Sequence, residues 1–192
     1  MPLAEIHRKT SRGSRRSEDV LTGEVFNLLT LVPPSLALLP WLRRAIRLDG
    51  GPLQVNKAGH AHASYWPRFK LGDRTVEPDV LLSVPGGDTS AAAIMLEVKY
   101  RSGLSGWPTG PEDVEIRGQL SLQWEVLADL EAHELPGKPL DICPRALVFL
   151  TPETALPRQA LELGRQELAD KGGDARGFER SVYWLSWFSL AE

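Results

Sequence analysis

The sequence predicts one α/β domain in which helices flank a mixed β-sheet. Its 192 residues, 42% of them hydrophobic, can bury one substantial core but are too few for two large domains. The hydrophobic periodicity changes along the chain in the order helix, three strands, helix, strand, helix, strand. Three strands that follow one another closely favour an antiparallel meander, and the continuous apolar run over residues 144–151 is typical of a central strand.

The N-terminal part of the chain is predicted to be a basic arm followed by a helix. Residues 1–16 are rich in arginine and serine, which indicates either a flexible basic arm or a frayed terminus without a role. Ser17 has the position of an N-cap, and the acids at the next two positions suit the positive end of a helix dipole. The helix is expected to end at about residue 32, because two prolines follow.

The later elements follow from the same periodicity and from the turn signals between them. Clusters of glycine and proline interrupt the chain at several points and predict turns or loops there. The expected elements are a short helix at 40–48, strands at 63–71, 75–84 and 92–100, a loop at 102–111, a helix at 112–133, a strand at 144–151, a helix at 157–171 and a strand at 181–190. We expect residues 17–192 to form a single domain, with a core at about 17–151 and a peripheral helix and strand at 157–190. The aromatic segment at the end of the chain is also compatible with a longer parent protein.

The composition excludes several classes of protein. A net charge of -3 argues against a protein that coats nucleic acid by charge alone. Cys143 is the only cysteine, which excludes an internal disulfide and a cysteine-rich zinc site. No apolar run reaches the roughly 20 residues that span a bilayer, and the N-terminus has no signal-peptide core. A soluble, cytoplasmic protein with no membrane partner is therefore expected.

Charged residues interrupt two of the predicted strands. Asp79 follows Pro78 in the second strand of the meander, and Glu97 and Lys99 alternate in the third. Residues two apart in a strand share a face, so Glu97 and Lys99 project together, with Asp79 beside them if the strands pair. The two carboxylates and the backbone carbonyl of Val98 offer the oxygen ligands that Mg²⁺ prefers. A bound metal ion lowers the pKa of a water molecule, and a lysine nearby can orient that water. The alternative is an ordinary ion pair on a solvated face.

Two predicted helices each place a polar residue on their core-facing side. At 100° per residue, Glu18 falls near the middle of the apolar stripe of the first helix, and Gln119 and Gln123 lie on the stripe of the helix at 112–133. Buried acids and amides need partners, so Glu18 and Gln119 are candidates for the same site. Alternatively, Glu18 is a first-turn acid at a frayed end and Gln119 is solvated. The apolar stripe of the first helix is predicted to consist of Leu21, Val25, Leu28, Leu29 and Val32.

This ordered set of residues resembles the PD-(D/E)xK nuclease superfamily, which has the restriction-endonuclease-like fold. The resemblance rests on Pro78-Asp79, on Glu97-Val98-Lys99, on Gln119 in the next helix, and on Glu18 as the additional acid that many members carry. The family core of helix, three strands, helix and strand corresponds to the order found over about 17–151.

The resemblance implies a role for each of these residues. Asp79 and Glu97 would hold Mg²⁺ or Mn²⁺, and Lys99 would position or activate the attacking water. Glu18 would be an outer acid or a ligand of a second metal ion, and Gln119 would contact water or a phosphate. The expected activity is that of a Mg²⁺-dependent endonuclease or exonuclease that hydrolyses phosphodiester bonds in DNA.

Basic residues near the motif suggest where a nucleic acid would lie. Arg68, Lys70 and Arg74 in the first hairpin, and Arg101 after the motif, are candidates for phosphate contacts. A homodimer or a larger complex is a further expectation. Two alternatives stay open: a catalytically weak or inactive module of the same fold that binds nucleic acid or assembles into a defence or repair complex, and an α/β domain whose acids are structural.

Overall fold

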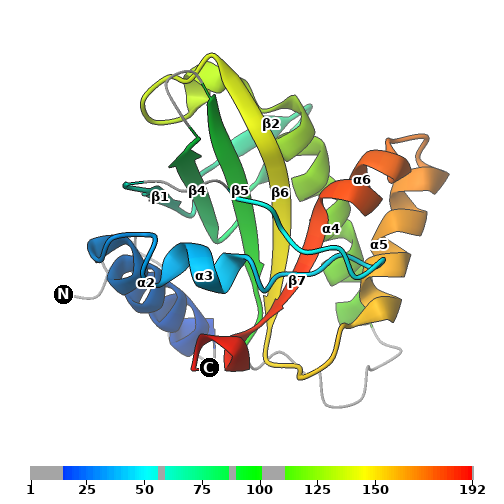
Figure 1. The fold of residues 1–192 in the computed structure, drawn as a ribbon. Coiled ribbons are helices and arrows are strands. Elements are labelled where there is room, and N and C mark those ends of the chain that lie inside the picture. Colours follow the sequence, from blue (N-terminus) through cyan, green and yellow to red (C-terminus); the bar gives the residue numbers. More distant parts are fainter. Residues whose placement is uncertain (1–14, 56–58, 87–89, 101–110, 192) are drawn as a thin grey trace.

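A five-stranded mixed sheet forms the centre of the molecule, in the spatial order β1-β4-β5-β6-β7 (Figure 1). The structure is a computed structural model that describes residues 15–55, 59–86, 90–100 and 111–191. The strands of the sheet are β1 (His62–Tyr65), β4 (Val80–Pro85), β5 (Ser90–Val98), β6 (Asp141–Thr151) and β7 (Val182–Ser186). β1, β4 and β5 pair antiparallel as the predicted meander, whereas β5, β6 and β7 pair parallel. The predicted mixed α/β architecture is therefore confirmed.

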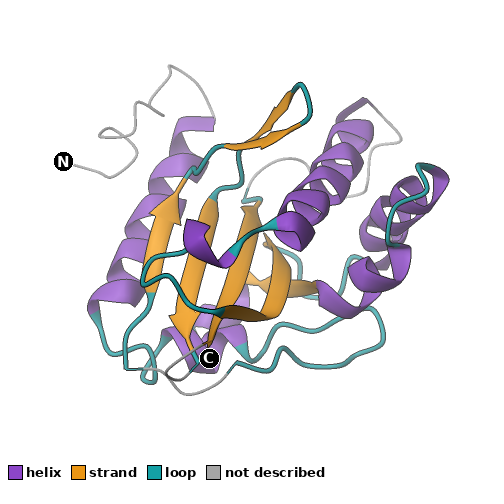
Figure 2. Cartoon of the chain, turned by 90° about the horizontal axis from the view of Figure 1, so that it is seen from above, coloured by secondary structure: helices purple, strands orange, loops and turns teal. Residues whose placement is uncertain are grey.

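Helices cover both faces of this sheet (Figure 2). One face packs against α2 (Arg15–Leu31) and α3 (Leu38–Leu42), and the other against α4 (Pro111–Asp129), α5 (Arg158–Asp170) and α6 (Ala175–Ser181). Two separate hydrophobic cores result, one on each side of the sheet. Because both faces are covered, a central strand has to be apolar at nearly every position.

The central strand β5 shows this constraint and its exception. Residues 91–98 are all buried, and their side chains alternate between the two cores, with Ile94 and Leu96 on the α2 side and Met95 on the α4 side. Glu97 belongs to the α4 side by the same alternation. A carboxylate is therefore built into a fully covered strand, where a charge is costly unless it has partners.

The meander contains an insertion that the sequence pattern did not reveal. The predicted strand at 63–71 is divided at Trp66, whose φ of 46° turns the chain, and the one at 75–84 is divided between Val76 and Val80. The intervening β2 (Phe69–Leu71) and β3 (Arg74–Val76) form a separate two-stranded hairpin. This hairpin turns its apolar side chains toward the core on the α4 side, which explains why its residues still alternate like those of a sheet strand.

The first helix differs from its prediction in start and in orientation. α2 begins at Arg15, so Ser17 lies inside the helix and not at its N-cap. Leu21, Val25 and Leu29 of the predicted stripe pack against the core as expected, whereas Leu28 and Val32 are exposed. Among the described side chains of the helix, Thr22 and Phe26 are also buried, so the buried face is centred away from Leu28 and Val32.

The C-terminal segment completes the main sheet. β7 pairs with β6 over five residues from Leu147↔Val182 to Thr151↔Ser186, so it is the edge strand beyond the predicted core. The predicted strand at 181–190 ends early in a 3₁₀ turn, η2 (Trp187–Leu190), and the seven-residue helix α6 before it was not predicted. A second 3₁₀ turn, η1 (Ala132–Glu134), follows α4 where a longer helix was expected. None of the helices in the described part of the chain has the length and apolar character that crossing a bilayer requires.

Candidate functional site

Asp79 and Glu97 lie opposite each other where β4 begins and β5 ends. The last paired residues of these strands are Val80 and Leu96, so Asp79 and Glu97 occupy the next register position and share a face of the sheet. The Asp79 backbone is fixed from two sides, because its N–H donates to the carbonyl of Leu96 at 3.2 Å and its carbonyl accepts from the Trp66 N–H at 2.9 Å. The expectation that the two acids come together on paired strands agrees with this register.

The Asp79 carboxylate is directed back at the end of β5. Its Oδ2 accepts a hydrogen bond from the backbone N–H of Val98 at 2.7 Å. The carboxylate thus holds the peptide that joins Glu97 to Val98. Charge-assisted hydrogen bonds of this kind are stronger than those between neutral groups, so Asp79 fixes the geometry of the strand end that carries the other acid.

Glu97 is the most deeply buried acid of the site. Its residue is 3% exposed, and both carboxylate oxygens have partners. Lys99 Nζ lies 2.6 Å from Oε1, and the side-chain amide of Gln123 donates to Oε2. The charge is therefore balanced by one cation, and the second oxygen accepts a hydrogen bond from a neutral amide, which together meet the requirement for a carboxylate inside a core.

Lys99 is held by its backbone at the end of the parallel strands. Its N–H donates to the Leu150 carbonyl of β6 at 2.8 Å, and its own carbonyl accepts from the Trp187 indole N–H at 3.3 Å. Trp187 is buried against Phe26 and Trp41, so α2, α3 and η2 all support this position. The predicted alternative of a solvated surface ion pair is contradicted, because the Lys99 side chain is only 17% exposed and that of Glu97 4%.

Gln123 connects α4 to this end of the sheet. Its residue is 2% exposed, and its amide nitrogen makes the hydrogen bond to Glu97. Its amide oxygen is buried and has no hydrogen-bond partner among the described residues. Gln119, one helical turn earlier, is half-buried. The helical-wheel pattern placed both glutamines on the core-facing stripe, but it did not show which of them reaches Glu97.

The remaining candidates are less closely tied to the site. Glu18 lies in α2 one turn before the buried Thr22, and its side chain is outside the described residues, as is Arg101 altogether. In the hairpin, Arg68 forms an ion pair with Glu77 at 2.7 Å, so its charge is partly balanced. The other two predicted phosphate contacts, Lys70 and Arg74, are exposed, and Lys70 donates to the Thr75 hydroxyl.

The donor atoms are oxygens, which suit a hard cation such as Mg²⁺ or Mn²⁺ better than a soft metal ion. No three His, Cys, Asp or Glu residues gather around one point in the part of the chain that the structure describes. Two carboxylates, Asp79 and Glu97, share one face, and the buried amide oxygen of Gln123 has no hydrogen-bond partner in the described part of the chain. One or two carboxylates with several retained water molecules are the usual protein ligands of Mg²⁺, so this donor set fits that ion.

Comparison with known proteins yields no relative: the chain matches no protein-family model, no curated protein and no solved structure. The function must therefore be inferred from the chemistry of the residues at this sheet end, because fold class alone does not determine activity.

Proposed function

We propose that the protein is a metal-dependent nuclease that hydrolyses phosphodiester bonds in DNA. The observation that carries the proposal is the buried ion pair between Glu97 and Lys99, placed at the carboxyl end of β5 with Asp79 at the adjacent register position. The carboxyl ends of parallel strands are where α/β proteins commonly place their ligands. This arrangement is also what the resemblance to the PD-(D/E)xK superfamily leads one to expect.

Stability gives a poor explanation for a charge at this position. A buried ion pair is often no more stabilising than apolar residues of the same size, because removing both charges from water costs about as much as their attraction returns. All neighbouring positions of β5 are apolar and buried. The Glu97–Lys99 pair is therefore better explained by chemistry than by packing.

Each residue has a distinct task in the proposed reaction. Asp79 and Glu97 would hold Mg²⁺ or Mn²⁺, and the carbonyl of Val98 is a further oxygen donor at the same strand end. When bound, the metal ion supplies a water of lowered pKa and positive charge beside the phosphate. The Lys99 ammonium orients that water or balances the charge that develops on the phosphate oxygens. Gln123 holds the Glu97 carboxylate in place through its amide.

A second candidate function is a nucleic-acid-binding or assembly module of the same fold with weak or no activity. It is favoured by one observation: both oxygens of Glu97 are already engaged, one by Lys99 and one by Gln123. A metal ion at Glu97 has to compete with these contacts. If the pair stays closed in solution, the carboxylate does not bind metal and no hydrolysis occurs.

Cleavage assays distinguish the two candidates. The full chain is incubated with supercoiled, linear and single-stranded DNA and with RNA, with Mg²⁺, Mn²⁺ or EDTA. Metal-dependent cleavage is expected, and Lys99→Gln and Asp79→Asn should each lower its rate by at least about 100-fold. Asp129→Asn, at an exposed position of α4, is the matched control and should keep full activity. Cleavage by Lys99→Gln and Asp79→Asn at the rate of the control would overturn the nuclease proposal, and a wild-type protein that binds DNA without cleaving it would favour the module.

A further inference from the structure

The edge of the main sheet at β7 is covered by a basic segment that pairs with it. Ile46 and Trp184 exchange both backbone hydrogen bonds, with N···O distances of 2.9 and 2.8 Å. Residues around Ile46 thus cap an edge that would otherwise be open to another strand. On either side of Ile46 the segment carries arginine, at Arg44 and at Arg47.

Arg44 and Arg47 reach opposite ends of β7. Arg44 donates to the carbonyl of Ser189 at 3.2 Å, in the turn η2 that follows the strand. Arg47 donates to the carbonyl of Arg180 at 3.4 Å, in α6 just before the strand. The segment therefore runs the length of the edge, from the end where the Trp187 indole holds Lys99 to the opposite end.

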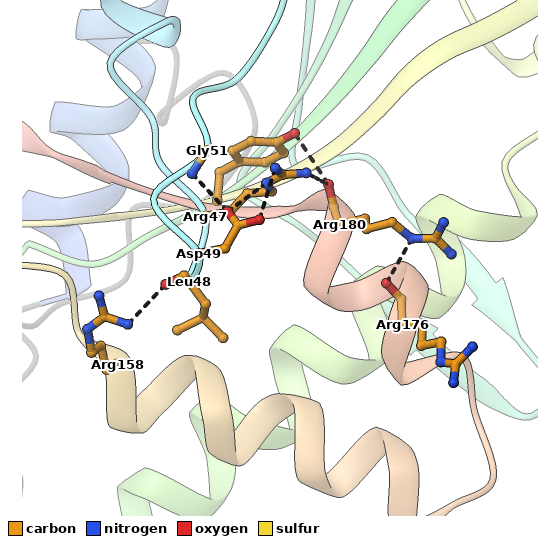
Figure 3. A network of polar contacts seen from close by, with 8 residues as sticks. Arg47, Leu48, Asp49, Gly51, Arg158, Arg176 and Arg180 are labelled. Carbon is orange, nitrogen blue, oxygen red and sulfur yellow. Dashed lines mark hydrogen bonds and ion pairs between the residues drawn. The ribbon is translucent and has the colours of Figure 1, made fainter.

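Three further arginines surround the end of this segment near α6 (Figure 3). Arg158, at the start of α5, donates to the carbonyl of Leu48 at 2.9 Å, and Arg180 donates to the carbonyl of Arg176 at 3.3 Å. Arg158, Arg176 and Arg180 are exposed, and none of them forms an ion pair with another described residue. We call Arg44, Arg47, Arg158, Arg176 and Arg180 the edge arginine cluster.

The acids nearby compensate only part of this charge. Asp49 pairs with Arg47 at 3.0 Å and also accepts from the Gly51 N–H at 2.8 Å. The Gly51 hydrogen bond, followed by the Arg47 guanidinium, holds the pKa of Asp49 below its usual value. Glu179 of α6 pairs with Arg165, which lies outside the cluster. No ion pair with a described residue balances Arg158, Arg176 or Arg180, so positive charge remains on this surface of a chain whose net charge is -3.

We infer that the edge arginine cluster binds the phosphate backbone of a nucleic acid duplex whose scissile part lies at the Asp79–Glu97–Lys99 site. The guanidinium groups of Arg158 and of the α6 arginines lie on different sides of the loop (Figure 3), so they suit a series of phosphates and not one small anion. Guanidinium groups bind phosphate oxygens in a fork geometry, and such contacts position a nucleic acid without reading its sequence. The inference rests on the proposed function for the identity of the polyanion.

Binding of a labelled 20-base-pair duplex, followed by fluorescence anisotropy in EDTA over a range of salt concentrations, tests the cluster. The variant is Arg176→Gln/Arg180→Gln, because those two side chains form no hydrogen bond or ion pair beyond α6 among the described residues, and the hydrogen bonds that anchor the loop stay in place. Lys138→Gln/Lys171→Gln removes the same charge from exposed positions outside the cluster and is the control, with the difference that Lys171 pairs with Glu167. Each lost phosphate contact should lower the slope of log K against log salt by about 0.9, so the variant should lose about 1 to 2 from the slope and bind several-fold more weakly.

Two outcomes overturn the inference that the cluster binds phosphates. One is a variant that binds the duplex as tightly as the wild type, and the other is an equal loss of affinity in the lysine control. Tighter arginine-dependent binding of polyglutamate than of the duplex would also overturn it, because the surface would then fit an acidic protein better than a nucleic acid. The result is separable from the proposed nuclease activity. If Lys99→Gln abolishes cleavage and the arginine variant binds as the wild type does, the nuclease proposal stands and the inference about the cluster is rejected. If binding depends on the arginines but no metal supports cleavage, the cluster binds nucleic acid and the nuclease proposal is rejected.

Discussion

Gln123 donates a hydrogen bond from its side-chain amide to the buried carboxylate of Glu97, and so joins α4 to the end of β5. The second carboxylate oxygen of Glu97 pairs with Lys99 at 2.6 Å. A charged residue near the end of the central strand thus has one cation and one amide as partners. The contribution of each partner to the free energy of unfolding can be measured separately.

Removing the cation should destabilise the fold. Lys99→Met leaves Glu97 buried without a counter-charge, and breaking a buried ion pair in this way should cost about 3 kcal/mol of the free energy of unfolding. Urea denaturation followed by tryptophan fluorescence measures the loss. Glu97→Gln/Lys99→Met removes both charges and should recover most of the stability without restoring cleavage. A single variant as stable as the wild type would show that the pair is open to solvent.

Removing the amide should distinguish the two glutamines of α4. Gln123→Leu deletes the donor to Glu97 and should lower stability by about 1–3 kcal/mol, because the carboxylate loses a partner in a buried setting. Gln119→Leu, one turn earlier and half-buried, is the matched control and should change stability by less. Cleavage rates of both variants show which glutamine serves the reaction. A larger loss of cleavage in Gln119→Leu would support the role that the sequence predicted for Gln119, a contact to water or phosphate.

Metal binding should depend on both acids of the strand pair. We expect Mn²⁺ to bind the wild-type protein in calorimetry and to raise its melting temperature, since a ligand that binds only the folded state stabilises it by mass action. Asp79→Asn and Glu97→Gln should each weaken the binding, because each removes a charged oxygen ligand. Binding that is equally tight in both variants would place the metal ion elsewhere.

Alkaline pH should weaken the packing of β7 through Tyr183. Burial raises the pKa of the Tyr183 hydroxyl above its usual value, and of two smaller effects Arg47 lowers this pKa while Asp49 raises it. The hydroxyl donates to the Arg180 carbonyl at 3.3 Å. Above about pH 10 the unfolded chain loses this proton first, so the folded state binds more protons and the free energy of unfolding falls with rising pH.

The comparison with Tyr183→Phe isolates this effect from other groups that titrate in the same range. Stability of the phenylalanine variant should fall less steeply between pH 10 and the raised pKa, and the two proteins should differ by a constant amount below pH 9. Parallel stability curves over the whole range would show that the hydroxyl ionises equally well in both states.

The main features of the fold follow from local patterns in the sequence. The buried run of β6 is continuous because both faces of the sheet are covered, and α5 follows a plain helical period between proline and glycine. The acids of the site were also visible, since Asp79 and Glu97 interrupt strands that are otherwise apolar. Short elements are harder to predict from such patterns. The hairpin of β2 and β3 has the same alternation as a sheet strand, so only its departure at Trp66 separates it from the meander.

Local patterns were enough to predict the class of fold and to bring Asp79, Glu97 and Lys99 together at neighbouring strands, because alternation within a strand is a local property. Three features became visible only in the packed molecule: the burial of the Glu97–Lys99 pair, the hydrogen bond from Gln123 to Glu97, and the basic segment that covers the β7 edge. These features depend on how helices and loops from distant parts of the chain pack against the sheet. Periodicity gives the face of a helix but not its position along the strand it covers, and for that reason it could not choose between two glutamines one turn apart.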